Sequence, residues 1–140
     1  MHGKRSWQTA IAIVGAACAV GLGGCAGRLP LRPTERFPAA SGTVKVTKDG
    51  QANVRLAIDV RHLPRPNEID PHLTTFVVWS IADGGKRVRN MGHIHVDSDQ
   101  RGSVEVVSPL PRFDILITAE VDEAAAAPSA FAVLRGSIGA

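Results

Sequence analysis

Residues 54–60 read Val-Arg-Leu-Ala-Ile-Asp-Val, with a branched or long apolar side chain at every second position. A period of two places alternate side chains on opposite faces of a β-strand, so this stretch predicts a strand with one face in a core and the other in water. Val44 and Val46 show the same alternation. The intervening Lys48-Asp49-Gly50 predicts a tight turn in which glycine supplies a positive φ, so we expect the two strands to pair antiparallel.

Five further segments carry strand signals between turn-forming residues. The most apolar is residues 75–81, Thr-Phe-Val-Val-Trp-Ser-Ile, which predicts a strand covered on both faces and a packed core position for Trp79. Residues 97–102 are interpreted as a turn in which Gly102 adopts a positive φ. The other four strand segments are 88–96, 103–107, 114–119 and 131–134. Seven short strands between turns predict an all-β fold, an Ig-like antiparallel β-sandwich over residues 42–140.

The first 25 residues carry an export signal. Lys4 and Arg5 precede an uncharged run from Trp7 through Leu22. A positive segment, an apolar segment and small residues before a cleavage point are typical of secretory signals. The tetrapeptide Leu22-Gly23-Gly24-Cys25 resembles the lipobox of bacterial lipoproteins, which implies cleavage before Cys25 and a diacylglycerol on its sulfur.

We therefore expect three regions: a lipoprotein signal peptide over residues 1–24, the lipidated Cys25 with a flexible, proline-rich tether over residues 25–41, and the sandwich over residues 42–140. Pro30, Pro33 and Pro38, with few apolar residues around them, favour the extended tether. Cys18 lies in the segment to be removed, so no disulfide is expected.

The alternative to a lipid anchor is an uncleaved membrane helix from Trp7 to Cys25. Either would hold the domain at a bacterial membrane, on the extracytoplasmic side of the cell envelope. In some Gram-negative lipoproteins the residue after the cysteine directs sorting, and Ala26 then predicts the outer membrane. Without Lys4 and Arg5, 14 basic residues face 13 acidic ones. This balance lacks the positive excess that binding of nucleic acid needs.

Several short motifs recur in a fixed order and spacing over about Gly42 to Gly136. They are Phe76-Val77-Val78-Trp79, Gly84-Gly85, Met91-Gly92, Asp97 to Gly102, Ile117-Thr118-Ala119-Glu120 and Pro128-Ser129. Together they resemble the extracytoplasmic C-terminal domain of anti-sigma-K factors, which implies a β-sandwich. The cytoplasmic helical part that binds a sigma factor in that family has no counterpart in this sequence, so we do not expect sigma-factor binding. We expect a binding or structural module whose partner is an envelope protein.

The clearest cluster of potential ligands is Met91-Gly92-His93-Ile94-His95. On a regular strand Met91, His93 and His95 share one face, and imidazole with thioether suits copper. A copper-binding envelope protein is therefore the alternative function. The competing interpretation is that His93 and His95 merely occupy the solvated face of a strand.

Enzymatic activity and catalytic residues are not expected, because the sequence has no nucleophile motif such as Gly-x-Ser-x-Gly. Asp122 and Glu123 fall in a polar segment and are interpreted as solubilising charge. The two long irregular segments, Arg61 to Leu73 and Val121 to Ser129, are the expected location of a binding site.

Overall fold

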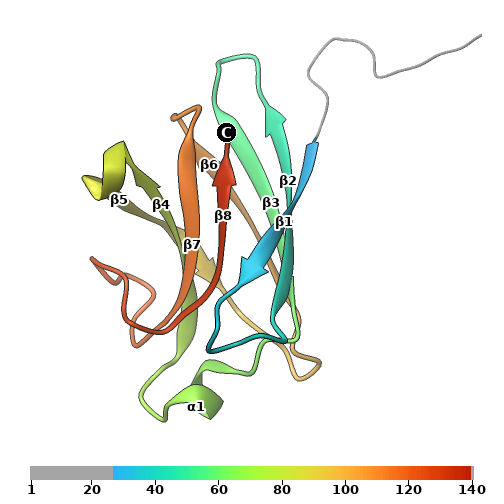
Figure 1. Ribbon diagram of the computed structural model, residues 1–140, viewed down its shortest axis with the longest axis vertical. Helices are drawn as coiled ribbons and strands as arrows, with labels where there is room; N and C mark the ends of the chain where they lie inside the picture. Colours follow the sequence, from blue (N-terminus) through green and yellow to red (C-terminus); the bar gives the residue numbers. More distant parts are fainter. Residues whose placement is uncertain (1–26, 140) are drawn as a thin grey trace, which may run out of the picture.

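The computed structural model describes residues 27–139 and places them in eight antiparallel strands with two short helical turns (Figure 1). The elements are β1 (Gly27–Pro33), β2 (Ser41–Lys48), β3 (Val54–Arg61), α1 (Pro66–Ile69), β4 (Thr75–Ala82), the 3-10 turn η1 (Asp83–Gly85), β5 (Arg87–Ile94), β6 (Gly102–Ser108), β7 (Phe113–Glu120) and β8 (Ala132–Ile138). The prediction of an all-β antiparallel fold is confirmed. Over the described range, none of the helices has the length and apolarity needed to cross a membrane.

The strands follow one hydrogen-bonded order, β5-β4-β7-β8-β1-β2-β3-β6. The order turns at β1, because residues 27–31 pair with β2 whereas Arg32 and Pro33 pair with Arg135 and Leu134 of β8. The strands β5, β4, β7 and β8 form one half of the sheet, the strands β2, β3 and β6 form the other, and β1 joins them. The two halves therefore face each other. The edge strands β5 and β6 come to lie next to each other, so the curled sheet is nearly barrel-shaped (Figure 1).

The predicted tether is wrong over residues 27–41, because β1 is an integral strand and the domain begins before Gly42. Leu31 is buried, and its side chain lies against Gly42 of β2 and Gly136 of β8. A Cβ on Gly136 would stand only 2.7 Å from Leu31 Cδ2, so this position accommodates glycine alone without displacement. The sequence does not predict this strand because of its prolines. Proline has no backbone N–H to donate to a neighbouring strand, so it normally argues against a strand. The described domain thus has eight strands rather than seven.

The main core lies between the two halves. Alternate residues point into it most regularly along β3, where Val54, Leu56, Ile58 and Val60 are buried. Leu63, in the connection between β3 and β4, is fully buried and belongs to this core. The period-two pattern of the sequence therefore defined the inner face correctly on this strand.

The β2–β3 and β5–β6 turns are built in the same way, around Asp49 and Asp97. In each turn the aspartate Oδ1 accepts hydrogen bonds from the backbone N–H groups two and four residues later, at 2.8 and 3.0 Å. These bonds to Gln51 and Asn53 lower the pKa of Asp49. The third residue after each aspartate has a positive φ, 69° at Ala52 and 62° at Gln100.

The predicted roles of Gly50 and Gly102 in these turns are therefore wrong, because neither has the positive φ. Gly102 is needed for a different reason: a Cβ there would lie 2.5 Å from the backbone oxygen of His95. The aspartate side chains, rather than the glycines, organise both turns.

Leu31→Ala should destabilise the domain by about 2–5 kcal/mol, because it removes a buried side chain at the strand that joins the two halves. Leu29→Ala is the matched control on the same strand, since Leu29 is 37% exposed; its effect should stay within about 0.5 kcal/mol. Urea unfolding followed by circular dichroism measures both. Equal, small effects of the two substitutions would contradict the integration of β1 into the fold.

Candidate functional site

The outer face of β4 is buried as completely as its inner face. Phe76 and Val78 belong to the main core, whereas Val77 and Trp79, also fully buried, alternate with them and point away from it. Trp79 is therefore buried as predicted but lies outside the core between the two halves.

The segment between β7 and β8, residues 121–131, covers this outer face. It leaves the end of β7 and reaches β5, where Asn90 Nδ2 donates hydrogen bonds to the backbone oxygens of Glu123 (2.9 Å) and Ala125 (3.1 Å). Because β4 lies between β7 and β5 in the sheet, the segment must cross β4. Figure 1 shows this segment projecting beside the β4–β5 side of the domain.

A buried hydrogen-bond network holds the segment in place. Trp79 Nε1 donates to Thr118 Oγ1 at 2.8 Å, and the Thr118 hydroxyl donates to Glu120 Oε2. The same carboxylate oxygen accepts the backbone N–H of Ser129 at 2.8 Å, and the Ser129 hydroxyl donates to the backbone oxygen of Ala119 at 2.7 Å. Glu120 is only 5% exposed, so these donors compensate its carboxyl group for the loss of water.

A β-bulge changes the directions in which the side chains of β5 point. Residue pairing with β4 shifts between Val78 and Trp79, whose partners are Gly92 and Asn90, so Met91 has no partner. Gly92 has φ of 149°, and its N–H donates to Asn90 Oδ1 at 3.0 Å. The extra residue on β5, Met91, breaks the strict alternation by which successive side chains of that strand point to opposite faces of the sheet.

The prediction that Met91 shares a face with His93 and His95 is therefore wrong. Met91 packs against the main core and lines a small hollow with Ser80 and Val107. A Cβ on Gly92 would face Val106, and Ile94 is fully buried in the core. The histidines consequently occupy the outer face without the thioether.

The third group beside the histidines is Glu123, for which the sequence alone predicts only a solubilising charge. His93 Nε2 and Glu123 Oε2 are 3.3 Å apart, with side-chain exposures of 38% and 58%. The rings of His93 and His95 meet edge to face with centroids 5.0 Å apart. One potential ligand atom from each residue lies within 4.8 Å of those of the other two. These three residues, His93, His95 and Glu123, are the candidate site.

The two long connections expected to hold a site both adjoin this cluster. Thr74, at the end of the β3–β4 connection, donates from its hydroxyl to the backbone oxygen of Val121 at 2.8 Å. His95 also borders a hollow of about 420 Å³ beneath the same connection, beside Pro66 and Leu73. His72 pairs with Asp70 instead of joining the cluster, and the pKa of Asp70 is lowered by the backbone N–H and the imidazole of His72.

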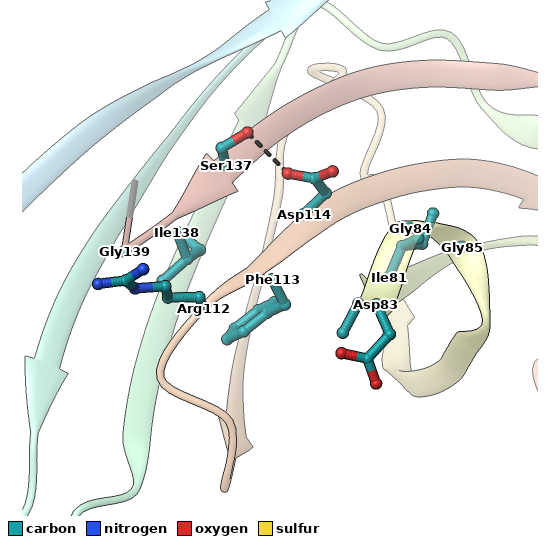
Figure 2. Close-up of a pocket in the computed structure, with 11 residues that line it drawn as sticks. Ile81, Asp83, Gly84, Gly85, Arg112, Phe113, Asp114, Ser137, Ile138 and Gly139 are labelled. Atoms are coloured by element: carbon teal, nitrogen blue, oxygen red, sulfur yellow. Dashed lines mark hydrogen bonds between the residues drawn. The ribbon is translucent and has the colours of Figure 1, made fainter.

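A larger hollow, of about 730 Å³, lies at the opposite end of the domain near η1 (Figure 2). Several of its polar groups are already paired: Ser137 Oγ donates to Asp114 Oδ1 at 2.8 Å, and Asp83 pairs with Arg87. Its lining includes no histidine that could serve as a base for Ser137. The His93, His95 and Glu123 cluster therefore has the more specific chemistry.

No protein-family model matches this chain, and no curated protein matches it. The resemblance to the C-terminal domain of anti-sigma-K factors thus stays a prediction. The residues that carry it have a clear structural role, because Trp79, Thr118, Glu120 and Ser129 form the network beneath the 121–131 segment. Cys25, the predicted lipidation site, lies outside the described residues.

Thr118→Val should lower the free energy of unfolding by about 1–3 kcal/mol, because valine keeps the shape but leaves the Trp79 N–H without an acceptor and removes one of the two donors to Glu120. Thr43→Val, at an exposed position of β2, is the control and should change stability by less than about 0.5 kcal/mol. Chemical denaturation measures both values. Indistinguishable midpoints would show that the network does not stabilise the fold.

Proposed function

We propose that this protein is a bacterial lipoprotein, held at a membrane by a lipid on Cys25, that displays the β domain on the extracytoplasmic side of the envelope as a binding module. The observation that carries the proposal is the sequence Leu22-Gly23-Gly24-Cys25 at the end of an uncharged run led by Lys4 and Arg5. Acyl chains contribute about 0.8 kcal/mol per buried CH₂ group, so a diacylglycerol with two chains anchors durably.

Because β1 begins at Gly27, a lipid on Cys25 would also determine how the domain is oriented relative to the membrane. Two residues span at most about 7 Å, so a lipid on Cys25 would hold the beginning of β1 close to the bilayer surface. The β2–β3 turn and the end of β8 lie at this same end of the domain (Figure 1). The β3–β4 connection and the 121–131 segment lie at the far end and face away from the membrane.

This arrangement supports recognition of an envelope partner at the far end. The two irregular connections, residues 61–74 and 121–131, meet there through Thr74 and Val121. Edge strands and end loops are the surfaces through which β domains usually bind proteins.

The copper hypothesis in its original form, with Met91 as a soft ligand, loses its support because Met91 packs against the core. A metal role for the two histidines therefore requires a different third ligand.

Cys25→Ala should abolish incorporation of labelled fatty acid and release the protein from the membrane fraction, because the acylated sulfur is the anchor. Cys18→Ala is the matched control, since it removes the other cysteine and should leave labelling and fractionation unchanged. Labelling in growing bacteria, followed by membrane fractionation, measures both properties. Membrane retention of Cys25→Ala would contradict the lipid anchor and favour an uncleaved helix.

A further inference from the structure

We propose that His93, His95 and Glu123 form a binding site for a divalent transition-metal ion of the zinc type. The site combines two neighbouring side chains of the β5 end with one from the 121–131 segment. It does not depend on the lipid anchor, because all three residues belong to the described domain.

The spacing of the side chains suits tetrahedral coordination. Zinc binds histidine nitrogen at about 2.0–2.1 Å and carboxylate oxygen at about 2.0–2.2 Å, so two ligands of a tetrahedral ion lie roughly 3.3–3.5 Å apart. The 3.3 Å between His93 Nε2 and Glu123 Oε2 matches this distance. The third ligand atom, on His95, lies within 4.8 Å of both. A small rotation of this exposed side chain completes the set.

The donor set selects the class of ion. Two imidazoles and one carboxylate are typical zinc ligands, with the fourth position left to water or to a group from another molecule. Calcium and magnesium prefer sites made of oxygen alone, and copper(I) prefers the sulfur that Met91 would have supplied. With Glu123 rather than Met91 as the third ligand, the expected metal is a divalent ion and not copper(I).

The fold holds the backbones that carry the three ligands close together before any ion binds. The bulge at Met91 and Gly92 turns both histidines outward. Asn90, three residues before His93, fixes the backbone of Glu123 through a 2.9 Å hydrogen bond. The Glu123 side chain is free of that bond, so it can serve as a ligand while its backbone stays anchored. Such support of the ligand backbone reduces the cost of ordering the site.

The test is calorimetric titration of the metal-free, untagged full-length chain in detergent with zinc chloride. We expect one zinc ion per chain. His93→Ala/His95→Ala should weaken binding by more than about 100-fold, because loss of even an outer partner of a metal ligand costs about 10–100-fold. Glu123→Gln should weaken it at least about tenfold, since the amide keeps a hydrogen bond to His93 but lacks the charge of a ligand.

Two controls separate this site from other sources of zinc binding. His62→Ala/His72→Ala removes the same number of histidines elsewhere, and Met91→Leu removes the thioether; both should bind zinc as the unaltered chain does. Cys18 and Cys25 are alkylated in every sample, so thiols do not contribute to the zinc binding that is measured. Circular dichroism verifies that each variant is folded.

Absence of zinc binding by the unaltered chain, or equal affinity of the His93→Ala/His95→Ala variant, would overturn the site. Unchanged affinity of Glu123→Gln would overturn the assignment of the third ligand. Failure of the lipid anchor would instead appear as membrane release or lost acylation, which these titrations do not measure.

Discussion

The buried carboxylate of Glu120 is the constraint on which the functional face of the domain depends. An ionised carboxylate removed from water is costly unless donors surround it, and its donors here come from Thr118 on the same strand and from the backbone of Ser129. The second donor is available only when the 121–131 segment folds back over the sheet. The hydrogen bonds of one buried carboxyl group therefore bring Ser129 back to the sheet, and the eleven-residue segment that contains it lies over Trp79.

The same segment creates the candidate metal site. Because β4 separates β7 from β5, a segment that leaves β7 and bonds to Asn90 brings Glu123 across the sheet to the histidines of β5. The bulge at Met91 and Gly92 supplies the other half of the arrangement by turning His93 and His95 to the outer face. Two features without any catalytic or metal motif in the sequence, a bulge and a folded-back segment, thus bring three ligand atoms together.

Much of this fold is readable from the sequence, because a period of two is a direct consequence of strand geometry. The alternation over residues 54–60 and the apolar run over 75–81 both correspond to strands. The sequence does not predict β1, because a proline-rich segment is typical of an extended tether. Its pairing partners, β2 and β8, also come from different halves of the sheet. Of the candidate site, the sequence predicts the two histidines as potential ligands but not Glu123. The histidines are two residues apart in sequence, whereas Glu123 is 30 residues away from His93. The bulge that excludes Met91 has no reliable local signal beyond Gly92.

The central claim is that the 121–131 segment is fixed over the outer face by Glu120 and thereby presents Glu123 to the histidines. Amide hydrogen exchange, measured residue by residue by NMR, tests it most directly at Ser129. This amide should exchange slowly, because it bonds to the buried Glu120. The amide of Ala119 should exchange equally slowly, because it bonds to the backbone oxygen of Phe131 at the other end of the same segment. Exchange as fast as that of Ala124, whose amide bonds only to the exposed Asp122 side chain, would contradict the account.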